Sequence, residues 1–289
     1  MERLKILITG ANGLLGSHAI ATFQDEYQVH AMVRQLPENP LKDVNYHVFD
    51  LKSDWSTDTL PAGVHSIFHL AQSELFRDFP EHALDVYNVN VTSTVMLLDY
   101  ARKTGVKKFV FASTGGIYDN SLASLNENSP INTFGLLGNY FATKLCSEIL
   151  SHNYTNYFDV TLLRIFFMYG KGQKRSMLMP RLVDNVRFGR AISLAGKEGI
   201  QINPIHVGDV VCLLEKLIFS SGSFTFNVAG PETLSLKQIC DIIGNRLGVS
   251  PIYEITDKEA PNFIADTELL RKLVYQPATK IEDKISELF

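Results

Sequence analysis

A glycine-rich turn places the strongest constraint on the fold of this chain. In ITGANGLLGS, Gly10, Gly13 and Gly16 directly follow the apolar run LKILIT (4–9) and open an amphipathic, helix-like stretch. Glycine lets such a turn close tightly, and it lets backbone N–H groups at the start of the helix approach a pyrophosphate. The order of strand, turn and helix therefore predicts a dinucleotide-binding unit. A tight turn that binds nothing is the alternative.

Short apolar runs alternate with longer helix-like stretches. Several runs are continuously apolar, as in strands that a parallel sheet buries on both faces. One helix-like stretch has a basic last turn and stops at Gly105, a typical C-terminal glycine, and another spans residues 137–156. The pattern predicts an α/β fold with a Rossmann-type, doubly wound parallel sheet. The expected strands are residues 4–9, 27–33, 46–50, 65–71, 107–113 and 160–166.

The character of the sequence changes near Gly170. A basic, glycine-containing loop, GKGQKRSM, is followed by shorter and more interrupted segments. We expect a dinucleotide-binding Rossmann domain over residues 1–170 and a smaller, mainly substrate-binding α/β part over residues 171–289. The boundary is soft if the chain crosses back to the main sheet.

The end of the second expected strand indicates the type of dinucleotide. NAD-binding proteins usually place Asp or Glu there, to hold the ribose 2′-hydroxyl. This chain has Val33 and Arg34, and a guanidinium can hold a 2′-phosphate through charge-assisted hydrogen bonds. The sequence therefore favours NADP, with NAD as the alternative if Arg34 is an ordinary solvated residue. Asp50, after the third strand, either accepts a hydrogen bond from the adenine amino group or caps the next turn.

Composition argues against several classes of protein. The formal net charge is −4 without a long run of either sign, which argues against a nucleic-acid or anionic-membrane partner. Cys146, Cys212 and Cys240 lie far apart, as free thiols of a reducing compartment do. His69 and His206 stand in apolar contexts without metal-ligand spacing, so no metal site is expected. No apolar run reaches the ~18 residues of a membrane helix, and no secretory signal pattern is present, so we expect a cytoplasmic protein.

Tyr140 and Lys144 in GNYFATKLCSE lie one above the other if residues 137–156 form a helix. A phenol that moves a proton at a carbinol carbon needs a pKa well below its usual value of about 10. An ammonium one helical turn away stabilises the phenolate and lowers that pKa. The spacing alone is equally that of an ordinary surface pair, so its meaning depends on the other motifs.

The order of these motifs resembles that of the extended short-chain dehydrogenases/reductases, in the branch of nucleotide-sugar epimerases, dehydratases and reductases. TGANGLLG matches the TGxxGxxG of that family, FHLAQS resembles its HLAA strand end, and NYFATK carries its YxxxK. LLRIFFMYGKGQ resembles LRxxNVYGPGQ, and INPIHVGDVV resembles RDFIHVDDVA. The resemblance covers nearly the whole chain. It implies a bound dinucleotide and hydride transfer at a carbinol or keto carbon, without a metal.

The resemblance also implies roles for individual residues. Tyr140 is the expected acid and base, and Lys144 lowers its pKa and holds the nicotinamide ribose. Thr114, or Ser113 beside it, orients the substrate oxygen. The other residues assigned to the cofactor are Gly10, Asn12, Gly13, Leu14, Leu15, Gly16, Arg34, Asp50, Leu51, Leu70, Ala71, Gln72 and Asn90. Those assigned to the substrate are Ser73, Gly115, Phe167, Lys171, Lys174 and Arg175.

The segment after the catalytic threonine departs from the family pattern. Dehydratases of this branch place Asp-Glu there as acid and base for eliminating water, whereas this chain has Gly115 and Gly116. A 4,6-dehydratase of that kind is therefore not expected. Asp119 also replaces the glycine that the family usually has after the tyrosine that is Tyr118 in this chain.

Two further departures concern the expected diphosphate site. Phe167 stands where the family often has an asparagine that contacts the substrate pyrophosphate, and Ile202 stands where many members have an arginine. Lys171, Lys174 and Arg175 are the candidate replacements, because a basic loop can neutralise phosphate. The alternative is an ordinary solvated loop.

We therefore expect an NAD(P)-dependent epimerase or reductase that transfers hydride to or from a carbinol or keto carbon, with a nucleotide-linked sugar as the favoured substrate. One alternative is an NADP-dependent reductase of a small non-nucleotide keto or hydroxy compound. Another is a catalytically silent NADP-binding regulatory protein, against which the presence of Tyr140 and Lys144 counts. Family members often dimerise through helices that include the tyrosine helix, and Leu145, Ile149 and Leu150 permit a homodimer.

Overall fold

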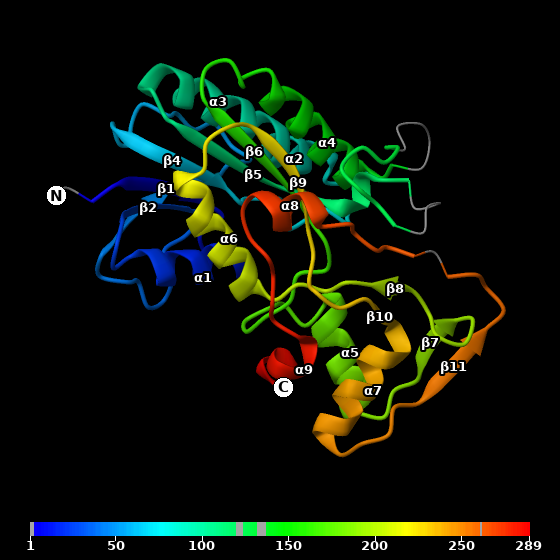
Figure 1. Ribbon diagram of the computed structural model, residues 1–289. Coiled ribbons are helices and arrows are strands. Elements are labelled where there is room, and N and C mark those ends of the chain that lie inside the picture. The colour runs from blue at the N-terminus through cyan, green and yellow to red at the C-terminus, as the bar shows by residue number, and fades with distance from the viewer. Residues whose placement is uncertain (1–2, 120–123, 132–136, 261) are drawn as a thin grey trace. The chain divides into compact units, whose positions relative to one another are not determined.

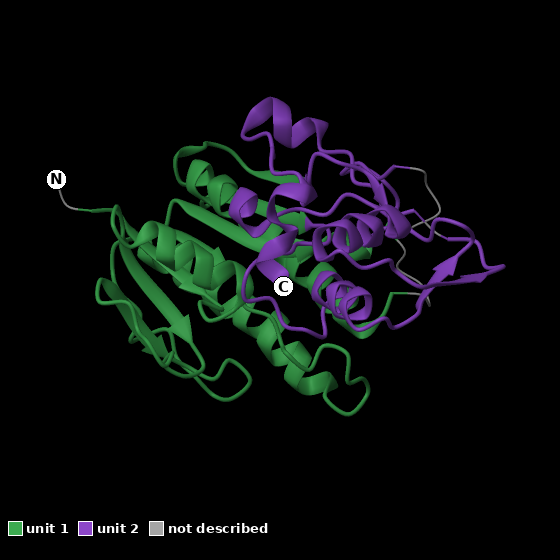
Figure 2. Ribbon diagram, turned by 90° about the horizontal axis from the view of Figure 1, so that it is seen from below, with its two compact units in different colours: residues 1–117, 131–164, 211–226 green, residues 118–130, 165–210, 227–289 purple. Residues whose placement is uncertain are grey.

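The computed structural model describes residues 3–119, 124–131, 137–260 and 262–289. It divides into two compact units, each made of several segments of the chain (Figure 2). Unit 1 comprises residues 1–117, 131–164 and 211–226. Unit 2 comprises residues 118–130, 165–210 and 227–289. Within the described residues, no helix is long and apolar enough to span a membrane.

A seven-stranded sheet forms the centre of unit 1, in the order β3-β2-β1-β4-β5-β6-β9 (Figure 1). The pairings from β3 to β5 are all parallel. The strand order reverses between β1 and β4, and sheets of this kind bind ligands beyond the carboxyl ends of strands at that point. The predicted α/β doubly wound fold is thus confirmed, and each of the six expected runs falls on a strand. The strands are β1 (Lys5–Thr9), β2 (Gln28–Val33), β3 (Val44–Val48), β4 (Val64–His69), β5 (Lys108–Thr114), β6 (Asp159–Ile165) and β9 (Phe224–Val228).

Helices cover both faces of this sheet, with α1 on one face and α3 and α4 on the other (Figure 1). As predicted, α3 ends at Gly105, which adopts a left-handed φ of 74°. The five residues directly before α3 form a π-helical turn, η1, and such turns are often found at functional sites. The helical elements are α1 (Leu14–Phe23), α2 (Ala83–Tyr87), η1 (Asn88–Thr92), α3 (Ser93–Thr104), η2 (Gly115–Ile117), α4 (Asn139–His152) and α6 (Val207–Phe219), of which α6 begins in unit 2.

The strands of the main sheet are buried because they are apolar on both faces. Leu7, Ile67 and Phe109 on β1, β4 and β5 are fully buried, and they share one core cluster with Leu97 and Leu98 of α3. Full burial of a side chain of this size contributes about 1.5–3 kcal/mol. This core holds the ends of β1, β4 and β5 rigidly, and the candidate site is built on those ends.

Unit 2 has its own core beneath two small sheets. Its cluster contains Tyr169, Leu182, Ile239 and Ile285. A capping box in which Ser235 accepts from the backbone of Gln238 begins its longest helix, α7. The elements of this unit are α5 (Leu178–Arg187), β7 (Ile192–Ala195), β8 (Gln201–Ile202), β10 (Leu234–Ser235), α7 (Leu236–Leu247), β11 (Tyr253–Thr256), α8 (Glu268–Leu273), α9 (Ile281–Lys284) and η3 (Ile285–Leu288).

The chain passes between the two units several times, so a single cut at residue 170 does not describe the division. Residues 118–130 belong to unit 2, and residues 211–226 return to unit 1. The return brings β9 to the edge of the main sheet, beside β6. The smaller unit is therefore assembled from insertions as well as from the C-terminal part of the chain.

Candidate active site

The glycine turn after β1 closes tightly against the end of β4. Gly10 has a φ of +67°, and a Cβ atom there would lie 2.8 Å from the backbone of Ala71. A Cβ atom on Gly16 would lie 2.3 Å from the carbonyl oxygen of Gly10. Both positions therefore require glycine, because backbone atoms on the other side cannot move aside as a flexible side chain can. The Gly13 N–H completes the turn by donating to the Gly10 oxygen at 2.8 Å.

This turn presents the first backbone N–H groups of α1. Gly13 is the N-cap and, as a glycine, has no side chain with which to cap the helix. The N–H groups that follow, from Leu14 and Leu15 to Gly16, are therefore available to a phosphate group, which the positive end of a helix dipole favours. A cradle too narrow for a Cβ atom, at the switch point of a doubly wound sheet, fits the pyrophosphate of a dinucleotide. Leu70 and Ala71 border the same turn from the end of β4.

Of four other residues expected at the cofactor, three make hydrogen bonds within the chain and the fourth, Leu51, lines a cavity. The amide of Asn12 donates to the Gln35 carbonyl at 2.8 Å. Asp50 accepts from the backbone N–H of Lys52 at 3.3 Å and thereby caps the turn that follows β3. Leu51 lines a cavity of about 500 Å³ beyond this turn. Arg34 donates to the carboxylate of Glu74 at 3.0 Å, and both side chains are about half exposed.

Asn90 in η1 is fully buried and organises the floor of the site. Its side-chain oxygen accepts from the Ser73 N–H at 3.0 Å, and its amide donates to the Thr143 hydroxyl at 2.9 Å. The backbone oxygen of Asn90 accepts from Ser147 at 2.8 Å. Asn90 thereby joins the loop after β4 to the helix α4, and Ser73, expected at the substrate, is 5% exposed and serves this join.

The structure brings Tyr140 and Lys144 to the same region of unit 1, on one face of α4. The Lys144 ammonium is buried and donates to the carbonyl oxygen of Ala112, on β5, at 2.8 Å. The Tyr140 hydroxyl donates to the Gln72 side-chain oxygen at 2.8 Å. The aromatic ring of Phe76 lies 4.9 Å from the tyrosine ring, between centroids.

Burial changes the proton affinity of both groups. It raises the pKa of the Tyr140 phenol above its usual value of about 10. It lowers the pKa of Lys144 to about 7, against the opposite influence of the Glu148 carboxylate. In the chain by itself, the phenol is therefore the stable form of Tyr140, and a phenolate needs additional positive charge nearby.

The two hydroxyls at the end of β5 have different surroundings. The Thr114 side chain is half-buried, and its oxygen accepts from the Gly116 N–H at 3.2 Å. Ser113 is 5% exposed and donates to the buried carboxylate of Glu148. Thr114 is thus the hydroxyl with access to a substrate. Gly115 follows it as a buried residue of η2.

The remaining residues expected at the substrate lie in unit 2. Phe167 has a φ of +43°, an unusual conformation for a bulky residue, and its ring packs edge-on against Phe263. Arg175 forms an ion pair with Asp184 and also donates to the carbonyl of Leu288. It therefore ties its loop to α5 and to the C-terminal turn. The side chains of Lys171 and Lys174 are both exposed.

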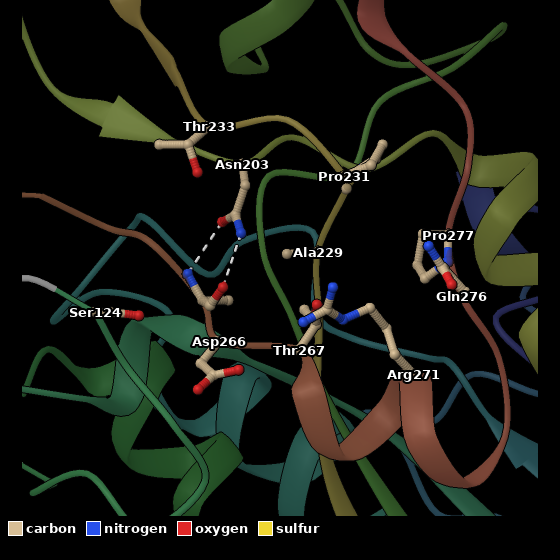
Figure 3. Close-up of a pocket in the computed structure, with 12 residues that line it drawn as sticks. Ser124, Asn203, Ala229, Pro231, Thr233, Asp266, Thr267, Arg271, Gln276 and Pro277 are labelled. Carbon is tan, nitrogen blue, oxygen red and sulfur yellow. Dashed lines mark hydrogen bonds between the residues drawn. The ribbon is translucent and has the colours of Figure 1, made fainter.

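Unit 2 also contains a cavity of about 330 Å³ that the sequence did not indicate (Figure 3). The Asn203 amide donates to the Ala265 carbonyl at 2.9 Å and its oxygen accepts from the Ala265 N–H at 3.1 Å, which fixes one wall. Gly230 lies against the backbone of Pro204, and Arg271 lines the opposite side. The polar groups that line the cavity include the Arg271 guanidinium, the Asp266 carboxylate and the Gln276 amide.

Residues 6–229 match the model of the NAD dependent epimerase/dehydratase family. The chain belongs to this family. The match covers more than half of the chain, and it confirms the resemblance seen in the order of the motifs.

Curated relatives in this family cover nearly all of the chain. The uncharacterized UDP-glucose epimerase YtcB of Bacillus subtilis (strain 168) is 26% identical over 98% of this chain and 96% of its own length. The UDP-glucuronate 4-epimerase of Thermodesulfobacterium geofontis (strain OPF15) is 24% identical over 96% and 92%, respectively. UDP-glucuronic acid 4-epimerase from Bacillus cereus, solved with UDP-glucuronic acid and NAD, has a TM-score of 0.85 at 20% identity, covering 98% of this chain and 97% of its own. This likeness shows the fold.

Within the family, the glycine pair after Thr114 has a physical basis in this chain. A Cβ atom on Gly116 would lie 2.1 Å from the ring of Phe141, on the first turn of α4. A glutamate in place of Gly116 would therefore displace Phe141, the neighbour of Tyr140. The packing of this epimerase/dehydratase family member thus agrees with the absence of the Asp-Glu pair.

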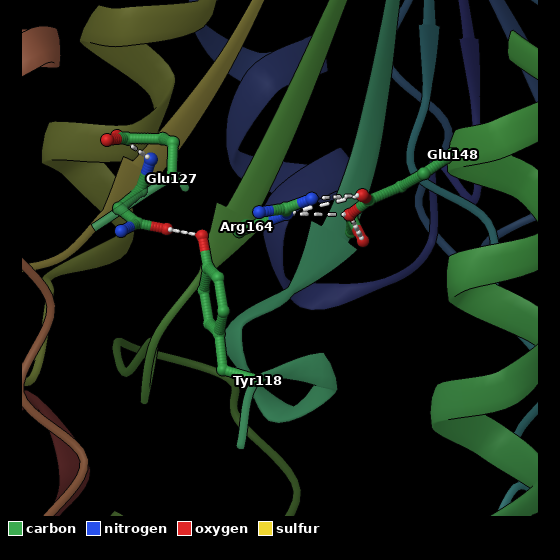
Figure 4. Close-up of polar contacts among 6 residues, drawn as sticks. Tyr118, Glu127, Glu148 and Arg164 are labelled. Atoms are coloured by element: carbon green, nitrogen blue, oxygen red, sulfur yellow. Dashed lines mark hydrogen bonds and ion pairs between the residues drawn. The ribbon is translucent and has the colours of Figure 1, made fainter. Parts of the chain in front are cut away.

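Sequence reasoning missed two charged residues behind the site. Glu148 and Arg164 form a buried ion pair, at 2.8 Å between Oε2 and Nη2 (Figure 4). The available signal was the position of Glu148, one helical turn after Lys144. Gln72, which the sequence assigned to the cofactor, accepts from the Tyr140 hydroxyl through its side-chain oxygen.

Proposed function

We propose that this protein is a UDP-sugar epimerase that keeps its dinucleotide bound through the catalytic cycle. The observation that carries the proposal is the arrangement of Tyr140 and Lys144 on α4, with Lys144 bonded to the strand that ends in Thr114. Two epimerases of UDP-sugars among the relatives, which align with nearly the full chain, support the substrate class. A bound nicotinamide supplies the chemistry of taking a hydride from a carbinol carbon and returning it to the opposite face.

In this proposal, the protein's own residues move one proton and hold one oxygen. Tyr140 acts as the phenolate: it gives up the hydrogen bond that its phenol form donates to Gln72, accepts one from the substrate hydroxyl, takes that proton while the carbinol is oxidised, and returns it afterwards. The Lys144 ammonium stabilises the phenolate form of Tyr140. The Thr114 hydroxyl donates to the substrate oxygen and steadies the charge that develops on it. Phe76 and Phe141 keep water from the phenol ring.

The cofactor residues follow from the glycine cradle. The backbone N–H groups of Leu14, Leu15 and Gly16 hold the pyrophosphate, and Lys144 holds the nicotinamide ribose. Of the basic residues expected at the substrate, Arg175 in unit 2 is already engaged by Asp184. Phe167 and Ile202 supply no polar group in place of the family asparagine and arginine.

Substrate turnover tests the proposal directly. The purified protein is examined by mass spectrometry for retained dinucleotide, and then incubated with UDP-glucose, UDP-glucuronate and UDP-N-acetylglucosamine while the sugar signals are followed by NMR. We expect retained dinucleotide and conversion of at least one sugar to its epimer without net consumption of cofactor. An empty cofactor site, with NADPH consumed on addition of a keto compound, would instead establish the reductase alternative.

The preference for NADP over NAD stays a prediction that rests on Arg34. The Arg34–Glu74 ion pair is exposed, and such a pair contributes only about 0–1 kcal/mol, so a 2′-phosphate can displace Glu74. We expect Glu74→Gln to raise the affinity for NADPH about twofold to fivefold, because the competing charge is gone, with little change for NADH. Fluorescence titration with both dinucleotides checks this. A wild-type preference for NADH that Glu74→Gln leaves unaltered would rule out a 2′-phosphate contact.

A homodimer and a cytoplasmic location also remain proposals. Leu84 and Tyr87 on α2 and Ile149 on α4 are apolar side chains at least half exposed, on helices of unit 1 that contact each other. A second copy of the chain is the partner that we propose for this surface, and sedimentation of the purified protein measures the mass that decides it.

A further inference from the structure

A buried carboxylate lies one helical turn beyond Lys144. Glu148 on α4 is 3% exposed, Arg164 on β6 is 7% exposed, and Ser113 on β5 is 5% exposed. Arg164 donates its Nε to both carboxylate oxygens at 3.2 Å and its Nη2 to Oε2 at 2.8 Å (Figure 4). The Ser113 hydroxyl donates to Oε1. One carboxylate thus joins two strands of the sheet to the helix that carries Tyr140.

Stability alone does not account for this ion pair. Two charges lose their hydration when they are buried, and an apolar pair of similar volume often stabilises a fold as well or better. Removing one partner is different, because it leaves the other charge buried without compensation. What distinguishes this ion pair from apolar packing is therefore the effect of Glu148 on its neighbours.

The first neighbours are the last residues of β5. The Ala112 oxygen accepts from Lys144, and the Ser113 hydroxyl donates to Glu148. Two consecutive residues of the strand are therefore hydrogen-bonded to side chains on two consecutive turns of α4. Thr114 follows as the last residue of β5, so its direction depends on how these two residues are held.

The second neighbour is the charge of Lys144. The Nζ of this ammonium lies over the Phe111 ring, 4.8 Å from the ring centroid, and donates to the Ala112 carbonyl. His69 on β4 is neutral, because burial and, secondarily, Lys144 lower its pKa to about 3. Burial lowers the pKa of Lys144 to about 7, and the carboxylate of Glu148 is the charge that opposes this effect. Tyr140, on the same helix face, is a phenol.

We propose that Glu148 is a positioning residue for the proton transfer by Tyr140: its carboxylate, held by Arg164, fixes Ser113 and the end of β5 and is the counter-charge of the Lys144 ammonium. The proposal rests on the function proposed above. Neither Glu148 nor Arg164 contacts a reacting atom in this scheme. They act through Lys144, which stabilises the phenolate, and through Thr114, which donates to the substrate oxygen.

The first test is the pH dependence of turnover in Glu148→Gln. Without the carboxylate, Lys144 loses its proton at lower pH, and the Tyr140 phenolate, deprived of the ammonium, forms only at higher pH. The acidic limb of the kcat profile, which reports the ionisation of Tyr140, is therefore expected about one pH unit higher. The alkaline limb, which reports the loss of the Lys144 proton, is expected about one pH unit lower, with KM changed less than about twofold. A merely structural defect would lower kcat at every pH and leave the limbs in place, and that result would overturn the proposal.

Because Glu148→Gln leaves Arg164 buried with its charge only partly compensated, a second variant keeps the test decisive. The double variant Glu148→Leu/Arg164→Met removes both charges and preserves apolar volume, so it is expected to unfold near the wild-type temperature. The proposal predicts the same narrowed profile in this variant and a kcat at least about tenfold lower, since Lys144 has still lost its counter-charge. Recovery of the wild-type profile would show that the pair only fills space.

A third measurement needs no substrate. Ultraviolet difference titration of the dinucleotide-loaded protein follows the ionisation of Tyr140, which Tyr140→Phe identifies by the loss of its signal. In both Glu148 variants this ionisation is expected at higher pH than in the wild type. If no UDP-sugar is converted but the titration shifts, the proposed function fails and the role of Glu148 stands. If sugars are converted and the titration is the same in the Glu148 variants as in the wild type, the proposed function stands and the role of Glu148 fails.

Discussion

Replacing Tyr140 by phenylalanine is expected to lower kcat about a thousandfold, because the reaction loses the group that moves the proton. The ring contacts with Phe76 and Phe141 are kept, so the fold should be unchanged. Affinity for the dinucleotide should change by less than about threefold, since the hydroxyl removed is not among the groups that hold the pyrophosphate. Sugar conversion under single-turnover conditions, together with a fluorescence titration of the cofactor, measures both quantities.

Tyr157→Phe is the matched control for this prediction. Tyr157 is 66% exposed and lies in unit 1 like Tyr140, so the same loss of a hydroxyl should leave kcat unchanged. If Tyr140→Phe retains the wild-type kcat, another group transfers the proton, and the assignment of the helix pair as the catalytic pair is wrong.

Replacing Gly16 by alanine is expected to destabilise the fold and to weaken dinucleotide binding together. The new Cβ atom would lie 2.3 Å from the Gly10 oxygen and 2.7 Å from the Ala11 Cα, so α1 must move away from the turn. Overpacking of this kind costs about 1–3 kcal/mol in the free energy of unfolding. The same movement displaces the N–H groups at the start of α1, so affinity for the dinucleotide should fall at least about tenfold.

Gly138→Ala provides the comparison for that variant. Apart from its chain neighbours, no described residue has an atom within 4 Å of a Cβ placed on Gly138, and its φ is −60°, which any residue adopts. Urea unfolding without cofactor should therefore place this variant within about 0.5 kcal/mol of the wild type. If Gly16→Ala proves as harmless as Gly138→Ala, the turn has more room than the structure indicates, and the cradle does not bind as proposed.

The central sheet was predictable because its strands are apolar on both faces. The runs over residues 65–71 and 107–113 coincide closely with β4 and β5, and the end of α3 at Gly105 follows from a local rule about left-handed glycine. The glycine turn was equally local, since its three glycines, its strand and its helix lie within 20 residues. These features depend on short-range pattern, which a sequence displays directly.

The partners of polar side chains were not predictable, because they come from distant parts of the chain. Arg34 was expected to face a phosphate, and its partner Glu74 lies 40 residues away. Ser113 and Thr114 are adjacent and chemically alike, and only the packing of Glu148 behind β5 distinguishes the inward hydroxyl from the outward one. The assignment of residues 118–130 and 211–226 to the two units likewise depends on contacts that no local pattern encodes.

The late return of the chain to the main sheet has a consequence for its synthesis. On the ribosome, β6 is complete at Ile165, whereas β9, its neighbour on the outer side, begins only at Phe224. In the interval, β6 is an open edge whose backbone N–H and C=O groups can pair with another nascent chain. A stop of translation before residue 224 would leave the cofactor turn, Tyr140 and Lys144 all present on a sheet whose last strand is missing. Such a fragment carries every catalytic group named here and is nonetheless a substrate for chaperones and proteases before it can be an enzyme.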